Sequence, residues 1–175
     1  MSLTFAPRSK ARESIAPESI APDDSNATEN GAVPFTCRDI WTLASFAYDS
    51  TLVHDDAYQP DRGAYAELIT DIGGFACAYT SPRNGNRITL AVATSDDPLA
   101  FVALEAHIAA TSTQVLSFGP PSEIQVFKVR GVDSNIADYE IFLNGYWISA
   151  TSNLFHTPNG ATALIQALVQ TLSCE

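Results

Sequence analysis

Apolar residues recur every three or four positions in four stretches of the chain, which is the spacing of a helix with one buried face. The expected helices cover residues 37–48, 63–72, 99–110 and 158–172. Thr36 is placed to cap the first helix, with Asp39 in its first turn. The second is expected to end at Gly73-Gly74 because glycine tolerates the left-handed conformation of helix C-termini.

The third helix has the clearest predicted start. Asp97 can cap its free amides, and Pro98 at the first helical position loses no hydrogen bond. The apolar stripe expected to face the core consists of Leu99, Val102, Ala103 and Ala106.

Five other segments are rich in β-favouring residues, and two tight turns join pairs of them. The expected strands are 75–80, 88–94, 123–130, 137–143 and 146–151. Asn84-Gly85 and Asn144-Gly145 are hairpin signals, and strands joined by tight hairpins run antiparallel. We therefore expect an α+β domain in the order α-α-β-β-α-β-β-β-α, with one antiparallel sheet of about five strands and helices packed against it.

The first 33 residues have a different composition from the rest. They are rich in Ser, Ala, Pro and acidic residues, and the near-repeat Glu-Ser-Ile-Ala-Pro occurs at 13–17 and 18–22. Such a segment has too little apolar surface to fold, so residues 1–33 are predicted to be a disordered tail and 34–175 a single domain. Residues 1–7 have no apolar core typical of a signal peptide, so either the protein is cytoplasmic or its natural start differs.

Charge narrows the range of partners. The formal net charge is −11, and residues 34–175 contain six Lys or Arg. Nucleic-acid binding needs clustered basic residues, so we expect no nucleic-acid partner and no attraction to anionic membrane surfaces. No apolar run has the roughly 20 residues that span a bilayer, so no transmembrane segment is expected.

Candidate catalytic and metal-binding residues are dispersed. No GxSxG, GxGxxG or GxxxxGK[ST] motif occurs, so no cofactor is expected. His54-Asp55-Asp56 is the densest polar cluster; it is either a divalent-cation site or, as we prefer, a solvated acidic loop. His54 and Asp56 are also the candidates for a dispersed hydrolase site, while His107 and His156 lack partners at metal-ligating spacing.

Cysteines and late aromatic residues leave alternatives open. Cys37 and Cys77 are the natural disulfide pair in an exported protein, with Cys174 left over; otherwise all three are reduced, and the first two are small buried residues. Tyr146 and Trp147 follow a hairpin turn, so alternation sends their rings to opposite faces of the sheet. Either both rings pack in the protein, or one contacts a ligand.

The order of several short motifs resembles that of small exported lipoproteins of actinobacteria. These motifs are an early Cys and Trp, a D-x-Y-x-P loop, Gly-Gly before a second Cys, and late aromatic residues. In this chain they are Cys37, Trp41, Asp56-Ala57-Tyr58-Gln59-Pro60, Gly73-Gly74, Cys77, Gly145-Tyr146-Trp147 and Phe155. The resemblance implies a Cys37–Cys77 disulfide and an extracytoplasmic location, although no lipobox is present.

The resulting expectation is a non-enzymatic cell-envelope binding or accessory protein, tethered by its tail and binding a protein or small molecule. The alternatives are a hydrolase and a cytoplasmic regulatory module. Absence of a paired nucleophile and base favours binding over catalysis.

Overall fold

We describe a computed structural model, which defines residues 36–97, 99–115, 118, 123–129, 135–157 and 159–172. The predicted tail, 1–33, lies outside these residues, and the domain boundary stays a prediction. The helices are α1 (Cys37–Ala47), α2 (Tyr65–Asp71), α3 (Val102–Thr111) and α4 (Thr162–Leu172). The strands are β1 (Val53–His54), β2 (Phe75–Thr80), β3 (Arg87–Thr94), β4 (Thr113–Gln114), β5 (Ile124–Val129), β6 (Ala137–Leu143) and β7 (Tyr146–Ser152).

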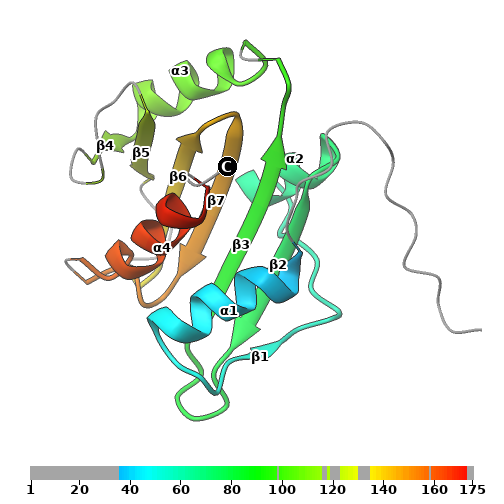
Figure 1. Ribbon diagram of the computed structural model, residues 1–175, viewed down its shortest axis with the longest axis vertical. Coiled ribbons are helices and arrows are strands. Elements are labelled where there is room, and N and C mark those ends of the chain that lie inside the picture. Colours follow the sequence, from blue (N-terminus) through cyan, green and yellow to red (C-terminus); the bar gives the residue numbers. More distant parts are fainter. Residues whose placement is uncertain are drawn as a thin grey trace, which may run out of the picture.

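These strands form one antiparallel sheet in the order β1-β2-β3-β7-β6-β5-β4 (Figure 1). The predicted α+β class and antiparallel pairing are confirmed. The count of five strands and the element order are wrong, because β1 and β4 add a two-residue strand at each edge. Segments so short contain no alternation that a sequence pattern could reveal. The β6–β7 turn is a tight hairpin, with positive φ at Asn144 (48°) and Gly145 (80°).

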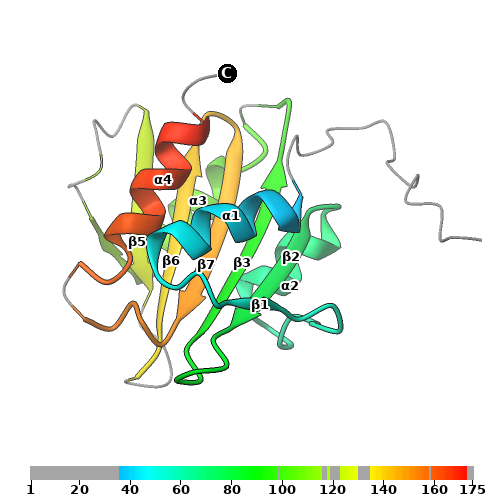
Figure 2. The same ribbon diagram turned by 60° about the horizontal axis from the view of Figure 1, so that its bottom comes forward.

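Helices cover both faces of this sheet. Helices α1 and α4 lie across one face, and α2 and α3 lie on the opposite one (Figure 2). We call these the α1/α4 face and the α2/α3 face. Alternation along each strand supplies a separate core to each: Ile141 of β6 packs on the α1/α4 face, whereas Phe142 packs on the α2/α3 face.

Helix α3 differs from its prediction in both start and orientation. It begins at Val102, and Asp97 caps the preceding turn by accepting a 2.9 Å hydrogen bond from the Leu99 amide. The predicted buried stripe is wrong, since Leu99 is 73% and Val102 50% exposed, and Ala103 and Ala106 are exposed as well. Ile108 is buried instead. This helix carries apolar residues on every side, so periodicity alone cannot say which side meets the sheet.

Candidate ligand-binding cleft

A cleft opens on the α2/α3 face between the two helices for which that face is named. Its volume is about 410 Å³, and its lining is mostly apolar. One wall contains Leu68 of α2 and Ile72, the residue that follows this helix. Another contains Leu104 of α3 and Phe101, the residue that precedes it, and the buried Trp147 lies at the base.

Helix α2 and the turn after it pack one apolar side chain on the sheet and leave others at the cleft. Ile69 is fully buried against the sheet, whereas its neighbours Leu68 and Ile72 remain 44% and 58% exposed. The helix ends at Asp71, Ile72 is its C-cap, and the chain then turns at Gly73, where φ is +90°. At Gly74, a Cβ atom would lie 2.4 Å from the Val92 carbonyl oxygen on β3, so only glycine allows this close approach.

Trp147 is held on three sides by other aromatic rings. The Phe142 ring is stacked with it at a centroid distance of 6.2 Å, and Phe101 and Tyr65 meet it edge-on at 6.1 and 6.2 Å. Aromatic pairs of these geometries stabilise beyond their buried area. Only 1% of Trp147 is exposed, so the indole is a preformed part of the cleft and not a mobile surface group.

Glu140 fixes the indole from below. Its carboxyl oxygens accept 2.8 Å hydrogen bonds from Trp147 Nε1 and from the Ser149 hydroxyl. The side chain is fully buried, and neither ion pair found within the described residues involves it. Burial raises the pKa of Glu140 to about 8, despite the lowering effect of both hydrogen bonds, so the carboxyl is mostly protonated at neutral pH. Burial also raises the pKa of Asp138 on the same face.

A second cavity, of about 500 Å³, adjoins the cleft and shares Ser95 and Phe101 with it. Tyr146 lines this cavity, and its ring packs against the core of the α1/α4 face. Tyr146 and Trp147 therefore face opposite sides of the sheet, as alternation predicts. Their roles as ligand contacts stay predictions, but only Trp147 belongs to the cleft.

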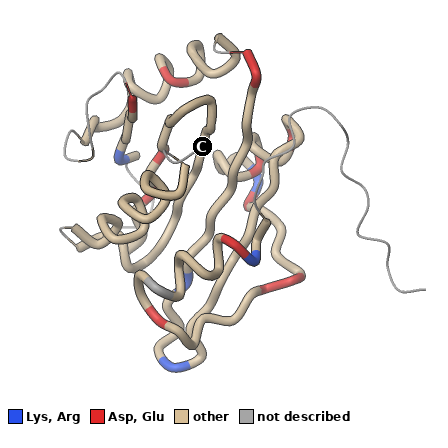
Figure 3. The backbone as a smooth tube through the Cα atoms, in the orientation of Figure 1, with Lys and Arg blue, Asp and Glu red and all other residues tan. Residues whose placement is uncertain are grey.

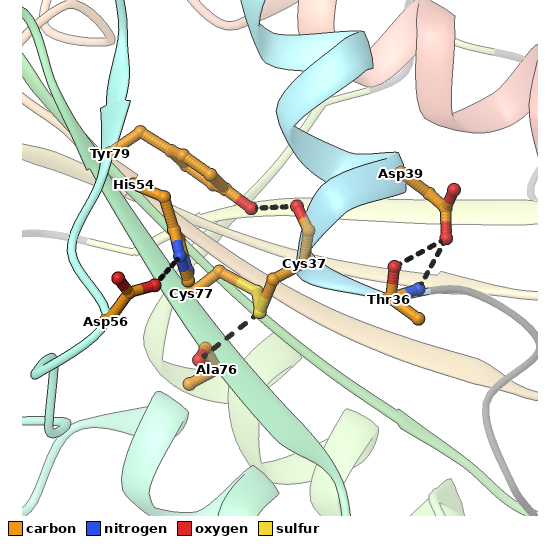
Figure 4. The surroundings of a disulfide bond; sticks show 8 residues. All are labelled: Thr36, Cys37, Asp39, His54, Asp56, Ala76, Cys77 and Tyr79. Atoms are coloured by element: carbon orange, nitrogen blue, oxygen red, sulfur yellow. Dashed lines mark hydrogen bonds and ion pairs between the residues drawn. A yellow bond between two sulfur atoms is a disulfide. The ribbon is translucent and has the colours of Figure 1, made fainter. Parts of the chain in front are cut away.

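The predicted disulfide between Cys37 and Cys77 is confirmed, with a Cα–Cα distance of 5.7 Å (Figure 4). It joins the first residue of α1 to the middle of β2. His54 lies beside it, with Nδ1 2.7 Å from Asp56 Oδ1. Asp55 pairs with Arg87 at 3.9 Å, and within the described residues its carboxylate is not grouped with His54 and Asp56 around one possible cation position. His107 is exposed on α3, and His156 is exposed in the turn that follows β7.

Sequence reasoning did not identify Glu140 or the cleft. The signal for Glu140 was its position in β6, where Asp138 and Glu140 alternate with Tyr139 and Ile141. Such alternation normally marks a solvent-facing side, but here helices cover that side as well. For Leu68 and Ile72, no feature of the sequence indicated that these apolar side chains would be exposed.

Comparison of the chain with protein-family models, curated proteins and solved structures finds no match. Within the described residues, no helix is both long and apolar enough to cross a membrane. Lys and Arg are few and separated along the described chain (Figure 3). The expectation that nucleic acid is not a partner stays a prediction.

Proposed function

We propose that this protein is a non-enzymatic binding protein of the cell envelope and that its cleft holds a small, neutral, apolar ligand. The observation that carries the proposal is the rigid indole of Trp147 at the base of an apolar cleft with exposed Leu68 and Ile72 on its wall. Small-molecule sites have volumes of about 300–1,000 Å³ and mostly apolar walls. No Lys or Arg lines the cleft, whereas Asp71 does, which disfavours an anionic ligand.

An extracytoplasmic location is supported by the disulfide, because such bonds persist in oxidising compartments. The order of motifs that resembles exported lipoproteins supports the same compartment. The polar, Pro-rich composition of residues 1–33 suits a tether that holds a domain away from a surface. Alkylation of thiols in intact cells, followed by mass spectrometry, tests this location. We expect the Cys37–Cys77 pair to be protected as a disulfide, and alkylation of both thiols would contradict the location.

Binding can be tested with N-phenyl-1-naphthylamine, a neutral apolar dye whose fluorescence rises in apolar surroundings. Ala100 lines the cleft, so Ala100→Phe should fill it and weaken dye binding about tenfold, which corresponds to 1.4 kcal/mol. Ala106→Phe is the matched control, because Ala106 is exposed on α3 and does not line the cleft. Equal affinity of both variants would contradict the proposed site.

Trp147 supplies a second readout once the other tryptophan is removed. In a Trp41→Phe background, Trp147 is the remaining tryptophan of the chain. Dye bound in the cleft should then quench tryptophan emission with the same midpoint as the rise in dye fluorescence. Dye binding without quenching would place the dye elsewhere.

A hydrolase is the second candidate, and the 2.7 Å pair of His54 and Asp56 favours it because a carboxylate orients a general-base histidine in this way. The ring, however, lies against Tyr79 and the disulfide, whose sulfurs cannot act as thiolate nucleophiles. A screen with esterase, glycosidase, peptidase and phosphatase substrates tests it. Turnover that His54→Ala abolishes, with the fold retained, would replace the binding proposal.

A further inference from the structure

Three side chains that bind soft metal ions meet at the N-terminal end of α1. The Sγ atoms of Cys37 and Cys77 and a ring nitrogen of His54 all lie within 4.8 Å of one another. They come from α1, β1 and β2 (Figure 4), so the sequence contains no short metal-binding motif that predicts this group. In tetrahedral zinc sites, Zn–S bonds of about 2.3 Å place neighbouring sulfur ligands about 3.8 Å apart. Small side-chain rotations therefore suffice to bring these three atoms onto one ion.

One ring nitrogen of His54 has a carboxylate partner, and the other is left for a metal. Its Nδ1 is engaged by Asp56 Oδ1 at 2.7 Å, which leaves Nε2 as the nitrogen available to a metal. In metal-binding histidines, the ring nitrogen that does not bind the metal commonly donates a hydrogen bond to a carboxylate. The carboxylate fixes the tautomer and raises the basicity of the nitrogen that binds the metal.

We propose that reduction of the Cys37–Cys77 disulfide opens a zinc site formed by both thiolates and the His54 imidazole. A dithiol reductant supplies two electrons and two protons; the S–S bond breaks, two thiols form, and the reductant becomes a disulfide. Zn²⁺ then displaces both thiol protons. Three protein ligands leave a fourth position for water or another ligand, as in open zinc sites. This inference is independent of the proposed cleft.

Contacts other than the disulfide keep the three ligands together after reduction. Trp41 Nε1 of α1 donates a 2.9 Å hydrogen bond to the Leu52 carbonyl, next to β1. The Tyr79 hydroxyl of β2 donates to the Cys37 carbonyl at the start of α1. In addition, His54 pairs with Tyr79 in the sheet, two residues from Cys77. Because these bonds do not involve sulfur, the thiols of the reduced protein stay close to His54.

The test uses the full chain carrying Cys174→Ser, so that the third cysteine contributes no thiol. After reduction and removal of the reductant without oxygen, Zn²⁺ is titrated in competition with a chromophoric chelator. We expect one Zn²⁺ per chain and, with Co²⁺ in its place, thiolate charge-transfer absorption. The oxidised protein should bind no stoichiometric Zn²⁺.

Variants identify the ligands. His54→Ala should weaken Zn²⁺ binding more than about hundredfold, and Asp56→Asn about tenfold, within the range known for outer-shell carboxylates. His107→Ala is the matched control, because this histidine is exposed on α3, and it should not change affinity.

The proposal fails if the reduced protein binds no stoichiometric Zn²⁺, or if His54→Ala binds it as tightly as the parent. Should the reduced protein lose its fold, circular dichroism decides. Recovery of the fold on adding Zn²⁺ supports the site, since metal-binding energy then becomes folding energy, whereas failure to recover overturns it. Dye binding by the oxidised protein reports on the cleft alone, so the two proposals can fail separately.

Discussion

The two faces of the sheet bury their apolar residues in different ways. On the α1/α4 face, two 11-residue helices contact each other and cover a large, mostly aliphatic core, and a disulfide ties one of them to the sheet. A smaller apolar pocket, of about 260 Å³, lies between these two helices. On the α2/α3 face, the core is smaller and richer in aromatic residues, and the carboxyl of Glu140 is buried beside it. Its helices leave apolar side chains exposed at the cleft between them.

This difference separates stability from binding. A large aliphatic core contributes free energy of folding in proportion to the apolar area that it removes from water. A layer with a larger cleft and a buried acid contributes less, because apolar surface left exposed adds nothing and the cost of burying a carboxyl has to be offset by its hydrogen bonds. The α1/α4 face, with the larger core, is therefore expected to contribute more to stability, and the α2/α3 face, with the larger cleft, is the one that we expect to bind.

The largest contrast should come from truncating matched leucines. Leu164→Ala on α4 removes a fully buried side chain and should lower the free energy of unfolding by about 2–5 kcal/mol. Leu104→Ala on α3 removes a partly buried one and should cost less than about 2 kcal/mol. Urea denaturation measures both, and equal losses would abolish the distinction between the faces.

Removing the disulfide on the α1/α4 face should also lower the free energy of unfolding substantially. The bond spans 40 residues of sequence, and in the chain-entropy model a loop of that length contributes about 4 kcal/mol. We expect Cys37→Ala/Cys77→Ala to lower the free energy of unfolding by about that amount. In the parent protein, unfolded but not reduced, thiol titration should find one free thiol. Three free thiols would show that the bond does not form.

Glu140 should make stability depend on pH. Its pKa is raised from 4.5 to about 8, so the folded state binds more protons than the unfolded state between these values. Stability is then greatest below pH 4.5 for this group and falls as pH rises toward 8, by roughly 3 kcal/mol between pH 5 and pH 8. Glu140→Gln should flatten the curve over that range, as measured by urea denaturation at each pH. A parent protein that gains stability over that range would contradict the buried, protonated carboxyl.

The smallest effect concerns the outer side of α3. Val102 is 50% exposed, so Val102→Ser should change the free energy of unfolding by less than about 0.5 kcal/mol. Ile108→Ala, at the buried position of the same helix, should cost about 2 kcal/mol or more. If Val102→Ser cost as much, α3 would face the sheet with the stripe predicted in the sequence analysis, and the orientation described above would be wrong.

Much of the fold is legible in local sequence. Asn144-Gly145 adopts the positive φ angles of a tight hairpin, and Ile124, Val126 and Phe127 separate onto the two faces as alternation requires. The buried side of α4, with Leu164, Ile165, Leu168 and Leu172, also follows its pattern. These features depend on backbone preferences and on one apolar side per element, both of which neighbouring residues determine.

The candidate sites depend on contacts between distant residues. No local pattern shows that helices cover both faces of the sheet, and that covering buries Glu140 and leaves the cleft beside Trp147. Likewise, the pairing of β1 with β2 brings His54 to the disulfide from a segment whose sequence resembles a polar loop. The sequence by itself determined which segments form helices and strands and how most of them alternate. Only the tertiary structure decided which side of α3 is buried, that the carboxyl of Glu140 is removed from water, and that His54 lies beside Cys37 and Cys77. Each of these depends on surfaces that distant segments supply.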